Sequence, residues 1–243
     1  MAVTFDAKSG TGTNIVNATS VTVAHTNAGT ATAIFVIVSY WSTGAAQQDL
    51  TGVTYAGTTM TKIGASARSN GMDISEIYFL AGPATGLNNI VASFRNSAAG
   101  NAGSVQGFSF IGTPTTGGSG VVWADFTSTA TSVNAANSSI SIPNNTANDA
   151  IIDGVTDGAA VTPTMGAQTN RTLAASGNAN GEGSGASYLV PAPSGSQTMN
   201  WTFASTSSAQ AGVRVLATAA GGLPPGRPNG LSGSRQMQSL LAQ

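Results

Sequence analysis

The sequence predicts an all-β protein: an antiparallel, jelly-roll-like β-sandwich with an extended C-terminal arm that ends in a short helix. Three observations lead to this fold class. Short apolar or alternating runs recur at roughly 8–15-residue spacing, separated by Gly, Asn, Ser and Pro. Only 8 basic and 9 acidic residues occur among 243, whereas an ordinary domain is about one quarter charged. A Gly/Pro-rich segment begins at Gly221 and changes the composition abruptly.

The individual strands follow from these runs. Ala33–Tyr40 is apolar on both faces, which predicts a central strand buried on both sides. Gly52–Tyr55 and Thr59–Ile63 flank Ala56-Gly57-Thr58 and predict a hairpin. Further strands are expected at 21–24, 74–80, 89–94, 104–111, 121–126, 139–142, 150–155, 187–190, 199–203 and 212–217.

We expect two parts, a β-sandwich domain over residues 1–220 and an arm over 221–243. Pro and Gly prevent regular structure in residues 221–230. Beyond them, three apolar residues at i, i+3 and i+4 spacing predict one face of a short helix, which Ser234 could cap. This arm either docks on a partner or folds back on its own sandwich. The apolar anchors expected for docking are Leu223, Met237, Leu240 and Leu241.

Composition excludes several classes of function. The net charge of −1 provides no footprint for nucleic acid. The absence of cysteine excludes disulfides, thiolate metal sites and a cysteine nucleophile. The longest apolar run is about six residues, far below the roughly 20 that span a bilayer. No secretory signal is visible at the start, so we expect synthesis in a host cytoplasm. We also expect no cofactor.

Few residues are suited to catalysis. His25 is the single histidine, and we expect it on the surface or at a strand end. No G-x-S-x-G motif accompanies it. Asp73 and Glu76 are three apart on a predicted strand, so they point to opposite faces and make a poor glycosidase pair. We therefore expect a protein that is not an enzyme.

Three acids recur every fourth residue, at Asp149, Asp153 and Asp157. Together with Asn148 they could offer oxygen ligands to calcium. The alternative is that they mark strand ends and a polar face. The spacing matches no EF-hand loop, and the sequence leaves both interpretations open.

Large aromatic side chains could stack on sugar rings; they are Tyr40, Trp41, Tyr55, Trp123 and Trp201. Trp201 alternates with Met199 and Phe203, which indicates burial. Trp41 is followed by Ser42-Thr43-Gly44, which predicts a loop. Trp41 is therefore the candidate for glycan contact.

Several segments resemble, in order, a jelly-roll-like β-sandwich module of tailed-phage structural proteins and bacterial extracellular proteins. Gly52–Gly64 is similar to its V-T-Y-x-G-x-x-[LM]-T hairpin, and Glu76–Gly86 to its W-Y-L-x-x-P-x-x-G strand and turn. Ser104–Gly112 resembles a third strand, and 199–203 with 211–217 the closing pair. The resemblance covers about residues 3–218 and implies a binding or structural role without catalytic residues.

These observations predict a structural protein of a tailed-phage virion, most simply a capsid decoration or accessory protein held by its arm. Its partners would be other virion proteins and further copies of itself, with no nucleic acid and no membrane. The alternative function is a carbohydrate-binding or adhesion module on a tail fibre or bacterial surface.

Overall fold

The computed structural model describes residues 1–9, 13–16, 18–42, 50–69, 72–95, 102–114, 122–159, 161–179 and 182–218. These residues confirm an all-β chain with antiparallel sheets. Among them, no helix is long and apolar enough to cross a membrane. The predicted helix after Ser234 and all four arm anchors lie outside the described residues.

The first half of the chain, residues 1–114, forms two sheets. Its inner sheet has the order β1-β10-β4-β8-β7, with β2 also pairing β10, and its outer sheet has the order β3-β9-β5-β6. The strands are β1 (Thr4–Lys8), β2 (Thr13–Val16), β3 (Ser20–Asn27), β4 (Ala33–Trp41), β5 (Leu50–Tyr55), β6 (Thr58–Thr59), β7 (Thr61–Ser69), β8 (Asp73–Ala81), β9 (Gly86–Phe94) and β10 (Ala102–Ile111).

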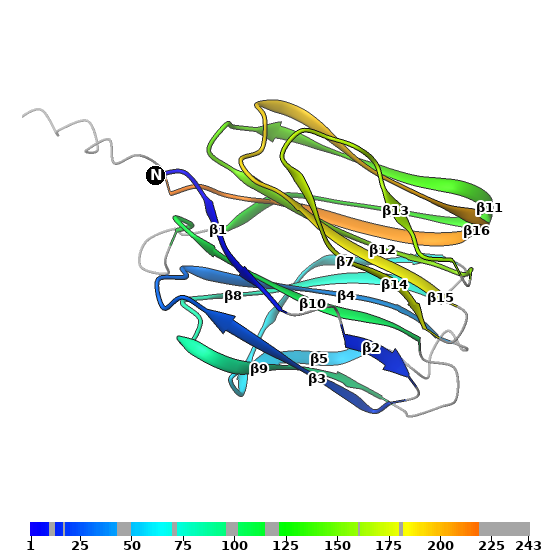
Figure 1. Ribbon diagram of the computed structural model, residues 1–243, viewed down its shortest axis with the longest axis horizontal. Helices are drawn as coiled ribbons and strands as arrows, with labels where there is room; N and C mark the ends of the chain where they lie inside the picture. Colours follow the sequence, from blue (N-terminus) through cyan, green and yellow to red (C-terminus); the bar gives the residue numbers. More distant parts are fainter. Residues whose placement is uncertain are drawn as a thin grey trace, which may run out of the picture.

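The second half, residues 122–218, forms an inner sheet of order β11-β16-β12-β15-β14, with β13 also pairing β16. β11 and β16 pair along nearly their whole length, with register shifts midway. There the ribbon turns back over its own sheet (Figure 1). We call residues 137–145 and 195–202 the outer ribbon. The strands are β11 (Trp123–Asn145), β12 (Ala150–Asp157), β13 (Thr164–Met165), β14 (Arg171–Ala179), β15 (Glu182–Leu189) and β16 (Gly195–Val215).

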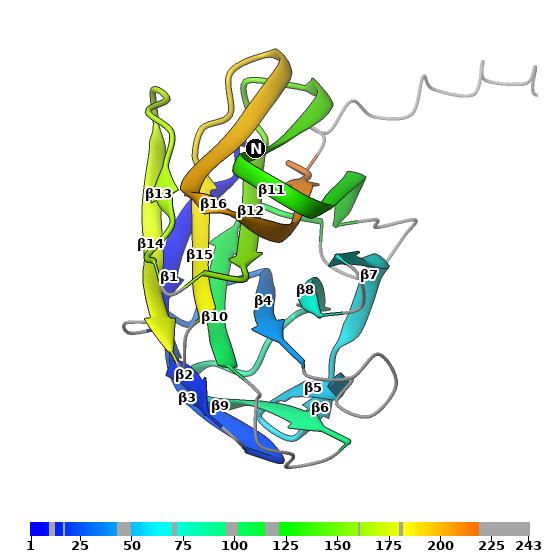
Figure 2. The same cartoon turned by 90° about the vertical axis from the view of Figure 1, so that its right-hand side faces the viewer.

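The layers are stacked, with the two inner sheets face to face in the middle (Figure 2). A continuous apolar core fills the seam between them, including Phe35 and Phe108 from the first half and Ile152 and Val213 from the second. A second core lies between the inner and outer sheets of the first half. β4 is therefore buried on both faces, as its sequence predicted.

The two halves repeat the same strand topology. In the first half the pairs are β3 with β9, β4 with β8 and β10, β5 with β9, and β7 with β8. In the second half, the outer-ribbon segment of β11 pairs with the outer-ribbon segment of β16, and β13 pairs with that same segment of β16. β12 pairs with β15 and with the rest of β16, and β14 pairs with β15. The registers make the following residues equivalent: Ile34 and Ile151, Val36 and Asp153, Tyr78 and Ser187, Leu80 and Leu189, Gly107 and Gly212.

A matched pair of glycines supports this duplication. Gly86 begins β9 and Gly195 begins β16, and their φ angles are 77° and 89°. Gly86 lies six residues after Leu80, and Gly195 lies six residues after Leu189. Each glycine also lies eight residues before a buried phenylalanine, Phe94 or Phe203. Positive φ favours glycine, so both halves use the same residue for the same turn.

The two ends of the stack are distinct. β4 starts at Ala33, which pairs with Phe110, and finishes at Trp41, which pairs with Asp73. Nine residues of strand span about 27 Å. The described chain stops at Thr218, whose amide donates to Gly112 O near the start of β4. We call this the arm end and the opposite one the far end.

Candidate functional site

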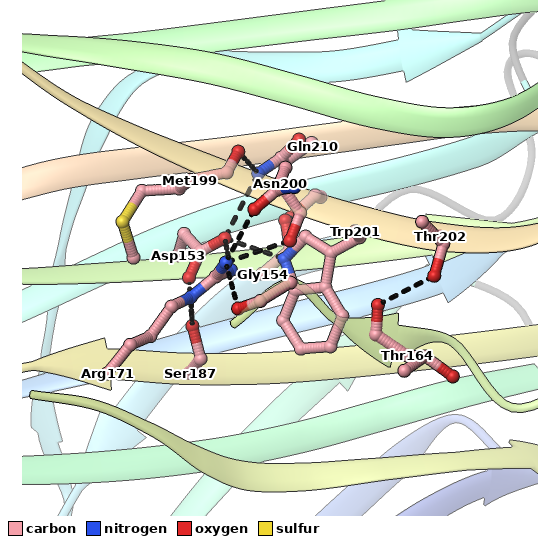
Figure 3. Close-up of polar contacts among 12 residues, drawn as sticks. Asp153, Gly154, Thr164, Arg171, Ser187, Met199, Asn200, Trp201, Thr202 and Gln210 are labelled. Carbon is pink, nitrogen blue, oxygen red and sulfur yellow. Dashed lines mark hydrogen bonds and ion pairs between the residues drawn. The ribbon is translucent and has the colours of Figure 1, made fainter. Parts of the chain in front are cut away.

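Five buried polar and aromatic side chains meet beneath the outer ribbon (Figure 3). They come from β12, β14, β15 and both segments of β16. We call them the Asp153 cluster. Its members are Asp153, Arg171, Ser187, Trp201 and Gln210, all of them buried.

The carboxylate of Asp153 is saturated with donors. Arg171 Nη2 donates to its Oδ2 at 3.0 Å, and Trp201 Nε1 donates to the same oxygen at 2.6 Å. Gln210 Nε2 also donates to Oδ2, at 3.0 Å, while Ser187 Oγ donates to Oδ1. Both oxygens of the Asp153 carboxylate are therefore already engaged by side chains of the protein.

The guanidinium of Arg171 is equally occupied. Its Nε donates to Ser187 Oγ at 2.9 Å, and its Nη1 donates to the backbone oxygen of Asn200 at 2.8 Å. The guanidinium carbon Cζ of Arg171 lies 5.2 Å from the ring centroid of Trp201, which makes a cation–π contact. Arg171 thus ties the outer ribbon to the inner sheet, and the Asp153 cluster is suited to structure rather than to chemistry.

The first half carries an apolar core at the equivalent places. Register equates Met60 with Arg171, because Thr61 pairs with Phe79 where Thr172 pairs with Tyr188. The full set of counterparts is Val36, Met60, Tyr78, Ala92 and Val105, and all five belong to the core between the first half's two sheets.

His25 differs from its prediction. The side chain lies two residues before the end of β3 and is buried, so the surface alternative of the prediction is wrong. Its Nε2 is 3.0 Å from Ser109 Oγ, and that hydroxyl donates to Asp6 at 2.7 Å. Since the serine proton goes to the carboxylate, His25 donates rather than accepts, which is the reverse of a nucleophile and its base. Burial lowers the pKa of His25 to about 4, against a smaller opposing effect of Asp6.

The three acids proposed for calcium do not converge. Asp149 holds a turn, accepting from Thr146 N at 2.9 Å and Ala217 N at 3.0 Å. Asp153 is in the middle of β12, not at a strand end, and belongs to the cluster above. Asp157 lies at the far end. Within the described ranges, no group of His, Cys, Asp or Glu is arranged to hold a metal ion.

Trp41 is the last residue of β4 rather than part of a loop, and it is half-buried. Trp201 is buried, as predicted. Every phenylalanine, tyrosine and tryptophan of the chain lies among the described residues, and none is exposed. The side chains that could stack on sugars are thus largely committed to packing.

Arg171, Ser187 and Gln210 were not predicted as site residues from the sequence. One signal was available: Asp153 and Arg171 are isolated charges inside runs that are otherwise uncharged, and lone charges in strands are buried only when paired. The comparisons add no homologue: no family model, no curated protein and no solved structure matches the chain.

Proposed function

We propose that this protein is a non-enzymatic structural component of a tailed-phage virion, a capsid decoration or accessory protein held by residues 221–243. The sheet orders of the first half support a jelly-roll assignment. The run β1-β10-β4-β8 within its six-stranded inner sheet and the four-stranded outer sheet β3-β9-β5-β6 have the strand orders of the two sheets of this fold. Jelly rolls are typical of viral capsid and lectin domains.

The observation that carries the proposal is how firmly the base of the arm is fixed. Leu216 N donates to Val122 O at 3.0 Å, and Thr218 N donates to Gly112 O at 2.7 Å. The amino terminus donates to Thr218 O at 2.8 Å. The arm therefore starts from a rigid point shared by both halves, which suits a tether that carries a folded body on a particle.

The test replaces the arm's apolar anchors in the full chain, as Met237→Ser, Leu240→Ser and Leu241→Ser together. We expect this variant to stay folded but to show no self-association in light scattering. We also expect it to be absent from purified particles. Leu87→Ser is the matched control, because Leu87 is 69% exposed on the outer sheet. Normal incorporation of the triple variant would rule out anchoring by the arm.

One observation favours glycan binding as the second candidate. Trp41 lies at the far end, about 27 Å of strand away from the arm end, where a displayed protein would meet a cell surface. Trp41→Ala should then abolish retention on a glycan column. Unchanged retention would exclude this residue as a glycan contact.

A further inference from the structure

The outermost strands of the stack carry no aspartate, glutamate, lysine or arginine. In the first half this holds for β3, β9, β5 and β6, which form the lowest layer in Figure 2. In the second half it holds for the outer ribbon and β13. All such residues of the described strands therefore belong to the inner sheets, although an ordinary domain is about one quarter charged.

A shallow hollow of about 610 Å³ lies on the outward face of the first half's outer sheet. Its volume falls within the range of about 300–1,000 Å³ that is usual for small-molecule sites. Leu87, Asn89 and the turn at 56–57 are exposed, so the hollow is open along the sheet. The lining includes Thr54, Ala56, Gly57, Leu87, Asn89 and Val91.

Two small residues keep one side of the hollow low. Ala56 and Gly57 form the turn between β5 and β6, with φ angles of 50° and 78°. Positive φ at both central residues is what a type I′ turn requires. Ala56 N donates to Asn89 O at 3.0 Å, which holds the turn against β9. Because neither turn residue has a side chain beyond Cβ, a ligand can approach the sheet closely here.

The opposite side of the hollow is fixed from beneath by hydrogen bonds. Asn27 Nδ2 donates to Ala84 O at 2.8 Å, and Asn27 Oδ1 accepts from Gly86 N at 3.1 Å. The Tyr55 hydroxyl also donates to Ala84 O, at 3.1 Å. These bonds order the turn that leads into Leu87. A site that is ordered before binding loses less conformational entropy when its ligand arrives.

The hollow offers polar and aliphatic groups side by side. Within the part of the chain that the structure describes, neither the Thr54 hydroxyl nor the Asn89 side-chain amide forms a hydrogen bond. Both groups donate as well as accept, so both can bond to a ligand hydroxyl. Leu87 and Val91 supply aliphatic surface beside them. Sugar rings present the same combination, with hydroxyl groups at their edges and C–H groups on their faces.

The equivalent place in the second half is covered by a side chain of the protein. Asn200 of the outer ribbon is the counterpart of Val91, since each lies five residues after its turn glycine. A Cβ on Gly166 would lie 2.1 Å from Asn200 Oδ1, so this amide lies directly over the neighbouring strand. Arg171 Nη1 donates to the same oxygen at 3.4 Å. The duplicated topology therefore has a covered version and an open version of this place.

The absence of charge selects the class of ligand. An ionic ligand would lose hydration on binding, and the four strands of this sheet offer it no opposite charge. A second copy of the chain is a poor occupant for a different reason. Strands at about 4.8 Å spacing cover roughly 400 Å² here, whereas a standard interface buries about 800 Å² per partner.

We propose that this hollow binds a neutral oligosaccharide. Thr54 and Asn89 bond to sugar hydroxyls, while Leu87 and Val91 contact the C–H face of a ring. Because the hollow is open along the sheet, it accepts an internal stretch of a longer polymer. This activity does not depend on a virion role, and the site is separate from Trp41, which ends β4 of the inner sheet.

The test measures binding of the full chain to an array of glucose, galactose, mannose and N-acetylglucosamine oligomers, with sulfated and uronic-acid oligomers beside them. Dense display raises the apparent affinity of weak sites. We expect binding to at least one neutral series and to none of the anionic ones. Thr54→Val/Asn89→Ala should weaken it about tenfold, through the loss of two neutral hydrogen bonds. Binding to no neutral oligomer, or to anionic ones alone, would overturn the proposal.

The matched control is Thr198→Ala on the outer ribbon. Thr198 is exposed and is the counterpart of Asn89, each three residues after its turn glycine, so this variant should bind like the parent. Thermal unfolding checks that all variants are folded.

Nuclear magnetic resonance locates the bound oligomer in the parent chain. The amides of residues 54–57 and 87–91 should shift when it is added. Loss of binding in Trp41→Ala but not in the double variant would contradict this site. Self-association in light scattering that the double variant abolishes, without glycan binding, would assign the face to a second copy and overturn the proposal.

Discussion

Val36 and Asp153 occupy the same position in the two halves of the chain. Each lies in the strand that pairs with two neighbours in its inner sheet, and each points away from the seam. Val36 packs in an apolar core, whereas Asp153 receives four hydrogen bonds. One strand topology is therefore maintained by two different kinds of interior.

The ion pair of the Asp153 cluster should behave as a coupled unit. Removing one partner leaves a buried charge unpaired, which costs about 3–5 kcal/mol. We expect Asp153→Val and Arg171→Met each to lower the free energy of unfolding by that amount. The double variant should cost clearly less than their sum, with a coupling of about 2–3 kcal/mol. Chemical denaturation of the four proteins measures this, and additive losses would refute the coupling.

His25 should make the protein sensitive to acid. Its pKa is about 4 in the folded state against 6.5 ordinarily, so the unfolded chain takes up a proton first. Stability is then complete above pH 6.5 and is lost as pH falls toward 4. The His25→Gln side chain can still donate to Ser109. Between pH 7 and pH 4, we expect the free energy of unfolding of this variant to fall by up to about 3 kcal/mol less than that of the parent. Thermal unfolding at pH 7, 5 and 4 is the measurement, and equal losses would contradict it.

Gly154 should be required for close approach of the two halves. A Cβ at this residue of β12 would lie 2.3 Å from Ile37 Cγ2 across the seam. Gly154→Ala should cost about 1–3 kcal/mol by overpacking. Gly52→Ala is its control, because nothing lies within 4 Å of a Cβ there. Similar melting temperatures for the two variants would show that the seam can open without penalty.

The duplication predicts equal effects at the two glycine turns that its halves share, at Gly86 and Gly195. Gly86→Ala and Gly195→Ala both place a side chain at positive φ with nothing within 4 Å of the new Cβ. Each should cost about 1–2 kcal/mol through backbone strain alone. Denaturant midpoints test this; a large difference between the two would mean that their turns are not equivalent.

Much of the fold followed from local sequence. The hairpin around Ala56-Gly57 forms as predicted, with Tyr55 paired to Thr58, because its turn residues and alternation are local. The duplication was not detectable in this way. Few equivalent positions keep the same residue, Leu80 and Leu189 among them, and the shared feature is strand register, which depends on distant pairing.

The Asp153 cluster was beyond prediction for a related reason. Arg171 is 18 residues from Asp153, and Trp201 and Gln210 lie still further along the chain. Their meeting requires the ribbon to turn back over its own sheet, which no local pattern encodes. The residues after Trp41 suggest a turn and so predict a loop, yet pairing with Asp73 extends β4 through Trp41.

The face-to-face packing of the inner sheets has a consequence for biosynthesis. The first half is complete at residue 114, but Phe35, Phe108 and Phe110 pack into the seam that the second half closes. At about 5–20 residues per second, about a hundred further residues take on the order of 5–20 s to emerge. Throughout that interval the nascent chain presents an uncovered aromatic sheet to solvent, so yield should depend on translation speed and on chaperones that shield that surface.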